Sequence, residues 1–154
     1  MMWVPPEDID PVLLHAPTRK SIALFGAIRL QDGSFVPRYA DTFDADSFQA
    51  FLEQLLRHRR NARTMLVIVD NARWRHARQL QPWLDEHRHV MRLDFLPPYS
   101  PDLNPVERVW KLTRYRCTHN RYFPVLDDLV AAVRHQFNLW ARPNDTLRRL
   151  CAII

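Results

Sequence analysis

A short apolar run in the middle of the chain constrains the fold most. Residues Thr64 to Val69 read Thr-Met-Leu-Val-Ile-Val, and the run ends abruptly at Asp70-Asn71. A continuous run of this length is typical of a strand that is buried on both faces in a parallel sheet. The rest of the chain is therefore expected to supply the helices and further strands of an α/β domain.

Upstream of this run, the pattern predicts a hairpin followed by a helix. Lys20 to Leu30 is rich in apolar residues, Asp32-Gly33 supplies a turn, and Ser34 to Ala40 alternates, as in an antiparallel hairpin. Asp44 can cap a helix that runs to about Arg60. Apolar residues at helical spacing form its expected buried face: Phe48, Phe51, Leu52, Leu55 and Leu56.

Downstream of the run, apolar spacing and prolines predict helices, a strand and irregular loops. In chain order we expect a helix at 72–86 that Pro82 kinks or shortens, a strand at 90–96, an irregular loop at 96–102, a helix at 105–117, a loop at 119–124 and a last helix at 126–140. The order ββαβαβαα predicts an α/β fold with a mixed sheet. The leucine, valine and aromatic stripe of the last helix is either core or a partner surface.

The first 18 residues differ from the rest. They hold four prolines and no periodicity, so we expect an extended leader at 1–18 and a domain at 19–154. The acidic, proline-rich start is unlike a secretory signal, and Ser21 to Ile28, the longest uncharged apolar stretch, is too short to cross a bilayer. Cys117 and Cys151 are the only cysteines. These features predict a cytoplasmic protein without a membrane partner.

Basic residues are concentrated after the first helix. The chain has 22 Lys and Arg residues against 17 Asp and Glu, and 20 of the 22 are arginines. Residues 57–154 contain 18 of the basic residues and 9 of the acidic ones. Because guanidinium groups match phosphate oxygens, this arginine excess favours a polyanionic partner.

Asp70 is the first candidate functional residue, because it lies where the buried strand meets the next loop. Ligands of α/β sheets bind at such carboxyl ends of strands. The alternative is structural: Asp70 or Asn71 could cap the following helix.

Glu107 is the second candidate, and its context also allows a structural reading. Asn104 is a favourable N-cap, Pro105 occupies the preferred first helical position, and Glu107 could complete a capping box. The two readings are compatible. A carboxylate in the first turn of a helix that follows a rigid proline-rich loop has little freedom, which a metal ligand requires.

The two carboxylates and their neighbours suit metal-dependent phosphodiester chemistry. The 36 intervening residues suffice for a helix, a strand and the proline loop, which returns Glu107 to the sheet edge where Asp70 lies. Two carboxylates suit Mg²⁺ or Mn²⁺. Basic residues that follow each carboxylate are candidate contacts to DNA phosphates: Arg73, Arg75, Arg78, Arg108, Lys111 and Arg114.

These residues carry a family resemblance. The segment Leu96-Pro97-Pro98-Tyr99-Ser100-Pro101-Asp102-Leu103-Asn104-Pro105-Val106-Glu107-Arg108-Val109-Trp110, with Val69-Asp70-Asn71 upstream, strongly resembles the DDE transposases of bacterial insertion sequences in the mariner superfamily. The resemblance covers essentially the whole chain. It implies an RNase H-like fold, two divalent metal ions that serve DNA cleavage and joining, and a nucleoid-associated bacterial protein that acts on transposon ends and target DNA. In it, Asp70 is the second acidic ligand and Glu107 the third.

The resemblance also implies a missing part. The family's first catalytic aspartate lies on the first, central strand, just before the region where this chain begins, and its DNA-recognition module lies further upstream. Glu7, Asp8 and Asp10 lie in the proline-broken leader and are not expected to replace that aspartate. We therefore expect an N-terminally truncated domain that is inactive and poorly stable as a lone chain.

Three alternatives remain open at this point. The chain is the downstream half of a split transposase, complemented by an upstream fragment or a full-length transposase, or it is a decayed remnant. The third is a non-enzymatic fragment that binds DNA through its arginines or interferes with a full-length transposase.

Overall fold

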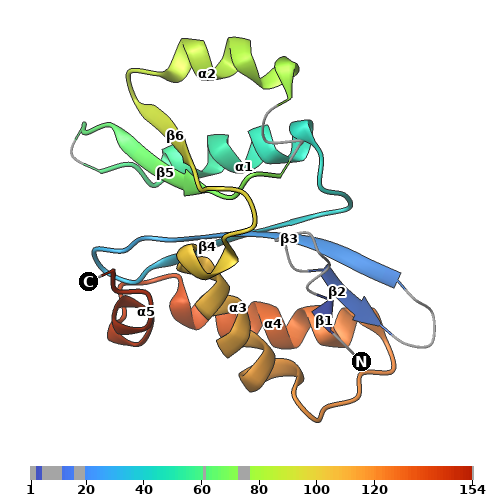
Figure 1. Ribbon diagram of the computed structural model, residues 1–154. Helices are drawn as coiled ribbons and strands as arrows, with labels where there is room; N and C mark the ends of the chain where they lie inside the picture. Colours follow the sequence, from blue (N-terminus) through green and yellow to red (C-terminus); the bar gives the residue numbers. More distant parts are fainter. Residues whose placement is uncertain (1–2, 5–11, 16–19, 61, 73–76, 154) are drawn as a thin grey trace. The chain divides into compact units, whose positions relative to one another are not determined.

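The chain is made up of two compact units. The computed structural model describes residues 3–4, 12–15, 20–60, 62–72 and 77–153. The first unit contains residues 1–41 and 105–154, and the second contains residues 42–104. Figure 1 shows the helices and strands of both units.

An antiparallel sheet runs through the first unit in the order β1-β2-β3-β4. Its strands are β1 (Trp3–Val4), β2 (Val12–His15), β3 (Lys20–Ile28) and β4 (Phe35–Ala40). The expected hairpin is confirmed, because β3 pairs with β4 from Ala23↔Ala40 to Ile28↔Phe35. The ladder between β2 and β3 is shorter and ends at Val12↔Ala23.

The described part of the leader differs from our expectation of a segment with little regular structure. Trp3–Val4 and Val12–His15 are strands, and Val12–His15 pairs with the start of β3. The physical reason is local: Val12-Leu13-Leu14 is an apolar run with strand propensity, between Pro11 and Pro17. The boundary between residues 18 and 19 stays a prediction.

The helices of the first unit cover one face of the β3–β4 hairpin (Figure 1). They are α3 (Val106–Thr113), a π-helical continuation η4 (Arg114–Thr118), α4 (Leu126–Trp140) and α5 (Asp145–Leu150). The helices expected at 105–117 and 126–140 and the loop at 119–124 are confirmed. The stripe on α4 is core, because Leu129, Val133, Phe137 and Trp140 are all buried.

Aromatic rings form the centre of this core. The Phe35 ring lies 4.9 Å from that of Phe137 and 5.7 Å from that of Trp110, with the Trp110 indole edge-on. Trp140 completes the cluster at 6.4 Å from Phe35. Such tilted and edge-on pairs add to the hydrophobic gain of burial, so one residue of β4 joins α3 and α4.

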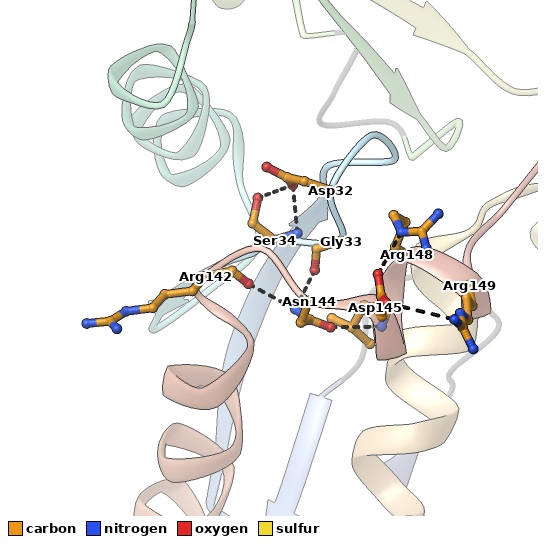
Figure 2. A network of polar contacts seen from close by, with 9 residues as sticks. Asp32, Gly33, Ser34, Arg142, Asn144, Asp145, Arg148 and Arg149 are labelled. Carbon is orange, nitrogen blue, oxygen red and sulfur yellow. Dashed lines mark hydrogen bonds and ion pairs between the residues drawn. The ribbon is translucent and has the colours of Figure 1, made fainter.

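Asn144 fastens α5 to the hairpin turn (Figure 2). Its Nδ2 donates to the Gly33 carbonyl at 2.8 Å and to the Arg142 carbonyl at 3.0 Å, while its Oδ1 accepts from the Leu147 N–H at 2.8 Å. Gly33 has φ +75°, and a side chain there would collide with Asn144 and Arg148 backbone atoms. The turn therefore needs glycine both for its conformation and for this close approach.

The second unit carries a parallel strand pair. α1 (Ala45–Arg57) begins with the expected cap, where Asp44 accepts from the Ser47 N–H at 2.7 Å, and buries Phe48, Phe51, Leu52 and Leu55. β5 (Met65–Val69) and β6 (Met91–Phe95) pair in parallel from Met65↔Met91 to Val69↔Phe95. Both expected strands and their parallel pairing are confirmed.

The prediction that β5 is buried on both faces is wrong. Leu66 is 61% exposed, and of the strand only Val69 is buried. The faces of a strand are covered by elements packed on the sheet and not by the neighbouring strand, and an apolar run does not reveal whether such elements are present. Among the described residues, the expected mixed sheet is seen as two sheets, one antiparallel and one parallel.

The helix expected from Ala72 is also wrong in its start. Ala72 is not helical, and residues 73–76 lie outside the described residues; the next described helical structure is the 3₁₀ turn η2 (Arg78–Leu80), followed by α2 (Gln81–His87). Pro82 lies in the first turn of α2, where proline is tolerated, rather than in a helix interior. Residues 96–100 are irregular as expected, and Pro101–Leu103 forms a 3₁₀ turn, η3. Among the described helices, none is both long and apolar enough to cross a membrane.

We predict that Asn144→Ala lowers the free energy of unfolding by about 1–3 kcal/mol, because it removes both an N-cap and a part-buried tie to the Gly33 carbonyl. Hydrogen exchange at the α5 amides measures the loss. Asn144→Asp is the matched control: it keeps the acceptor for the Leu147 N–H but has no donor for Gly33. Its protection of α5 should lie between those of wild type and Asn144→Ala, and wild-type protection in the alanine variant would contradict this account.

Candidate functional site

Asp70 lies at the carboxyl end of β5 and is only 4% exposed. Beside it, the Leu96 N–H donates to the Val69 carbonyl at 2.8 Å, so the ends of β5 and β6 stay joined. Asp70 Oδ1 accepts from the Ala72 N–H at 3.1 Å, which forms an Asx turn. This bond limits the orientations that the carboxylate can adopt.

The capping alternative for Asp70 is wrong for the helix that we expected at Ala72. Asn71 and Ala72 are not helical, and residues 73–76 lie outside the described residues. Asp70 is thus a buried carboxylate whose described hydrogen bond closes a turn. Burying a carboxylate is costly unless hydrogen bonds or a cation compensate it.

Glu107 lies in the first turn of α3 and is half-buried, with its Oε1 atom shielded from solvent. Asn104 has extended backbone (φ −94°, ψ 108°) and Pro105 is helical (φ −58°, ψ −28°). α3 begins at Val106 with Pro105 as its N-cap, one residue later than predicted, although Pro105 already has helical backbone and its carbonyl accepts from the Arg108 N–H at 3.1 Å. The capping box between Asn104 and Glu107 stays a prediction.

Trp110 fixes α3 against β3. The indole is 3% exposed, and a Cβ built on Gly26 would lie 2.5 Å from Trp110 Cη2 and 2.6 Å from Phe35 Cζ. The indole therefore occupies the volume that any other side chain at Gly26 would need. Val109, the residue before Trp110, is also fully buried.

The end of the chain braces the start of α3. Arg108 Nη1 donates to the carbonyls of Leu150 and Ala152 at 3.1 and 3.2 Å, and Cys151 Sγ donates to the Pro105 carbonyl at 3.4 Å. The Leu150 carbonyl belongs to the last turn of α5, where carbonyls lack helical partners. These contacts join the start of α3, on both sides of Glu107, to the end of the chain. Their partners lie more than forty residues apart in sequence.

Sequence reasoning missed α5 and the role of Arg108. The start of α5 was detectable, because Asn144-Asp145 is a favourable helix start. The role of Arg108 was not, since its acceptors are backbone carbonyls that leave no mark in the sequence. Arg108 is exposed and its guanidinium group donates to the carbonyls of Leu150 and Ala152, while its expected contact to DNA phosphates stays a prediction.

The other candidate phosphate contacts are spread over both units. Arg78 and Lys111 are exposed, and Arg114 is half-buried. Arg73 and Arg75 lie outside the described residues. Lys111 follows Glu107 by one helical turn, so these two residues share a face of α3.

The two carboxylates belong to different units, with Asp70 in the second and Glu107 in the first. Over the described ranges, no three His, Cys, Asp or Glu side chains are grouped so that they could hold a metal ion. The chemistry of the pair still fits Mg²⁺ or Mn²⁺, which need only one or two carboxylates when waters or phosphates supply the other ligands.

Comparison with known proteins identifies related sequences. A family model described as DDE superfamily endonuclease matches residues 2–130, a range that contains both carboxylates. The uncharacterized protein y4pE/y4sA of Sinorhizobium fredii (strain NBRC 101917 / NGR234) is 33% identical over 107 residues, which cover 70% of this chain and 76% of that protein. The insertion element IS630 uncharacterized 39 kDa protein of Shigella sonnei is 35% identical over 88 residues, which cover 57% and 25% respectively.

Solved structures show the fold. A chain of the Mos1 strand transfer complex matches 98% of this chain with a TM-score of 0.64 and 18% identity. A chain of the simian T-cell lymphotropic virus intasome, solved in complex with PP2A regulatory subunit B56 gamma, matches 80% with a TM-score of 0.58 and 15% identity. This chain spans 44% of the length of each. The likeness is to a mixed α/β fold of the RNase H-like type found in transposase and integrase catalytic domains.

We predict that the brace on α3 weakens at high pH. Burial raises the pKa of Cys151 from its usual value of 9 to about 11, although the Arg108 charge acts in the opposite direction. Between pH 9 and 11 the unfolded thiol ionises while the folded one stays protonated, so the free energy of unfolding falls as the pH rises. Urea unfolding at a series of pH values measures this slope.

Cys151→Ser is the control, because serine does not ionise in this range and keeps a donor for the Pro105 carbonyl. Tyr39 and Cys117, whose pKa values burial also raises, are unchanged in both proteins. The serine variant should therefore lose less stability between pH 9 and 11. Identical slopes in both proteins would refute the assignment to Cys151.

Proposed function

The chain belongs to the DDE superfamily endonuclease family, and from that premise we propose that it is the catalytic-domain portion of an insertion-sequence transposase. In this proposal, Asp70 and Glu107 are metal ligands for the cleavage and joining of DNA strands. One observation carries it: a carboxylate that is 4% exposed follows a parallel strand at the sheet edge where α/β proteins bind ligands. The family match spans that residue and Glu107.

The residues of the chain prepare these two carboxylates in different ways. The Ala72 N–H orients Asp70, and the first turn of α3, braced by Arg108 and Cys151, orients Glu107. Divalent ions held there supply activation of the attacking water or 3′-hydroxyl and stabilisation of the leaving oxygen. The fixed backbone around each carboxylate supports a ligand role, because metal sites require restricted ligands.

We further propose double-stranded DNA, as transposon ends and target, for the partner. Exposed Lys111 and Arg78 are available to contact phosphates, Arg114 lies one turn beyond Lys111, and Arg73 and Arg75 extend this set. Arg108 is exposed as well, and only its Nη1 atom donates to the carbonyls of Leu150 and Ala152, so its guanidinium group keeps donors for a phosphate. Contacts of this kind predict affinity that falls steeply with salt.

We also propose that the complete fold contains a further, central strand. β5 pairs with β6 along its whole length, and the described ladders give β5 no second partner strand. The family resemblance implies a strand between β3 and β5 that carries the first catalytic aspartate. We propose that another segment, from an upstream transposase fragment or a full-length transposase, supplies this strand. In this proposal, a chain without that strand holds two of the three acidic ligands and does not cut DNA.

We predict that Asp70→Asn and Glu107→Gln each weaken Mn²⁺ binding about tenfold or more, because each removes a charged ligand but keeps the side-chain shape. Titration calorimetry on the full chain measures the affinity. Asp102→Asn is the matched control, since Asp102 is an exposed carboxylate five residues before Glu107. Unchanged Mn²⁺ affinity in Asp70→Asn, or an equal loss in Asp102→Asn, would contradict the ligand assignment.

Affinity for Mn²⁺ separates this proposal from its alternative, because neither of them expects the lone chain to nick plasmid DNA. The lone chain should not nick DNA with Mg²⁺ or Mn²⁺, and nicking that disappears in Asp70→Ala would contradict its proposed inactivity. Salt-sensitive DNA binding without any affinity for Mn²⁺ would favour the non-enzymatic DNA-binding fragment instead.

A further inference from the structure

We infer that Tyr115, His119 and Tyr122 form a stacking surface for unpaired DNA bases next to the face of α3 that carries Glu107. This inference rests on the proposed function, because DNA as the substrate comes from there. It adds that part of the bound DNA is single-stranded and that aromatic rings of η4 and the following loop hold its bases.

The first observation is the exposure of the two tyrosines. Tyr115 is 72% exposed and Tyr122 is 68% exposed, while the aromatic core of the same unit is closed around Phe35, Phe137 and Trp140. The Tyr115 ring is stacked with His119, with centroids 6.1 Å apart and planes at 26°. Large rings that do not contribute to the core are available for a partner.

The second observation is the position of these rings on the helix. Glu107, Lys111 and Tyr115 follow one another at intervals of four residues, so they share a face of α3 and η4. Tyr115 lies about 12 Å along the axis from Glu107, at a rise of about 1.5 Å per residue. η4 is a π-helical turn, closed by the His119 N–H on the Arg114 carbonyl at 2.8 Å, and such turns are frequent at functional sites.

The third observation is the charge of the segment. Residues 108–125 contain five basic residues and no acidic one. Arg116 lies over the Trp140 ring at 5.7 Å and Arg121 over the Phe123 ring at 5.3 Å, so both cations are held on aromatic faces. Exposed Lys111 adds a third cation on the Tyr115 face.

Positive charge beside exposed rings commits this surface to one kind of partner. An uncharged apolar partner would not match the cations, whereas a nucleic acid backbone does. In a duplex the inner bases stack on one another, so away from the duplex ends rings of the protein stack on unpaired bases. Basic grooves with aromatic platforms are how proteins bind single strands.

The test compares two labelled DNA probes by fluorescence anisotropy with the full chain. One is a blunt duplex of about two helical turns. The other is the same duplex with a single-stranded extension of about four nucleotides, enough to span the 12 Å from Glu107 to Tyr115. Wild type should bind the extended probe more tightly.

Two double variants isolate stacking. Tyr115→Leu with Tyr122→Leu keeps apolar bulk without a flat ring, and should lose the preference for the extended probe by about 5- to 100-fold, with unchanged binding of the blunt duplex. Tyr115→Phe with Tyr122→Phe keeps the rings and should keep the preference. With 5-iodouracil in the extension, ultraviolet cross-links should map to Tyr115 or Tyr122.

Each other outcome overturns the inference in a distinct way. If the wild-type chain binds both probes equally, the inferred stacking surface is wrong, but DNA remains the proposed partner. Leucine variants that keep the preference show that the extension is bound elsewhere. A chain that binds neither probe overturns both this inference and the DNA partner of the proposed function.

Discussion

The contact between Trp110 and Gly26 is the constraint on which the first unit depends. A side chain at Gly26 would occupy the volume of the indole, so only glycine lets α3 come this close to β3. Phe35 meets the same indole edge-on and carries the contact on to Phe137. Because Trp110 follows Glu107 by one helical turn, the packing that closes the core also sets where the carboxylate lies along the sheet. The position of Glu107, a proposed metal ligand, and the packing of the core are therefore not separable in this helix.

The two carboxylates are held by opposite strategies. Asp70 is fixed locally, by burial at the end of β5 and by a bond from the Ala72 N–H two residues on. Glu107 is fixed from a distance, since Arg108 and Cys151 tie its helical turn to the end of the chain. A change near the carboxyl terminus can therefore alter Glu107 without touching it, while Asp70 responds mainly to its own strand.

Sequence patterns predicted what depends on local chemistry. The cap at Asp44, the parallel run Met65–Val69 and the helical stripe of α4 all follow from short-range spacing, and the structure confirms them. The patterns failed where context decides: Leu66 is 61% exposed although its strand is apolar throughout, and Ala72, where we expected a helix to begin, is not helical. For the site, both carboxylates could be named from the sequence because of their strand end and their proline-entered helix. The contacts that hold them in place could not be predicted. Backbone carbonyls that accept from Arg108, and a glycine such as Gly26 that leaves room for the Trp110 indole, produce no periodic pattern in the sequence.

The central claim is that Asp70 and Glu107 ligate the same divalent ions. Fe²⁺ in place of Mg²⁺, with ascorbate and peroxide, releases hydroxyl radicals that cut the polypeptide beside the bound ion, and mass spectrometry locates the cuts. The account predicts cuts near both residues, and it predicts that Asp70→Asn and Glu107→Gln each abolish both sets. Cuts near only one residue, or two sets that are lost independently, would contradict it.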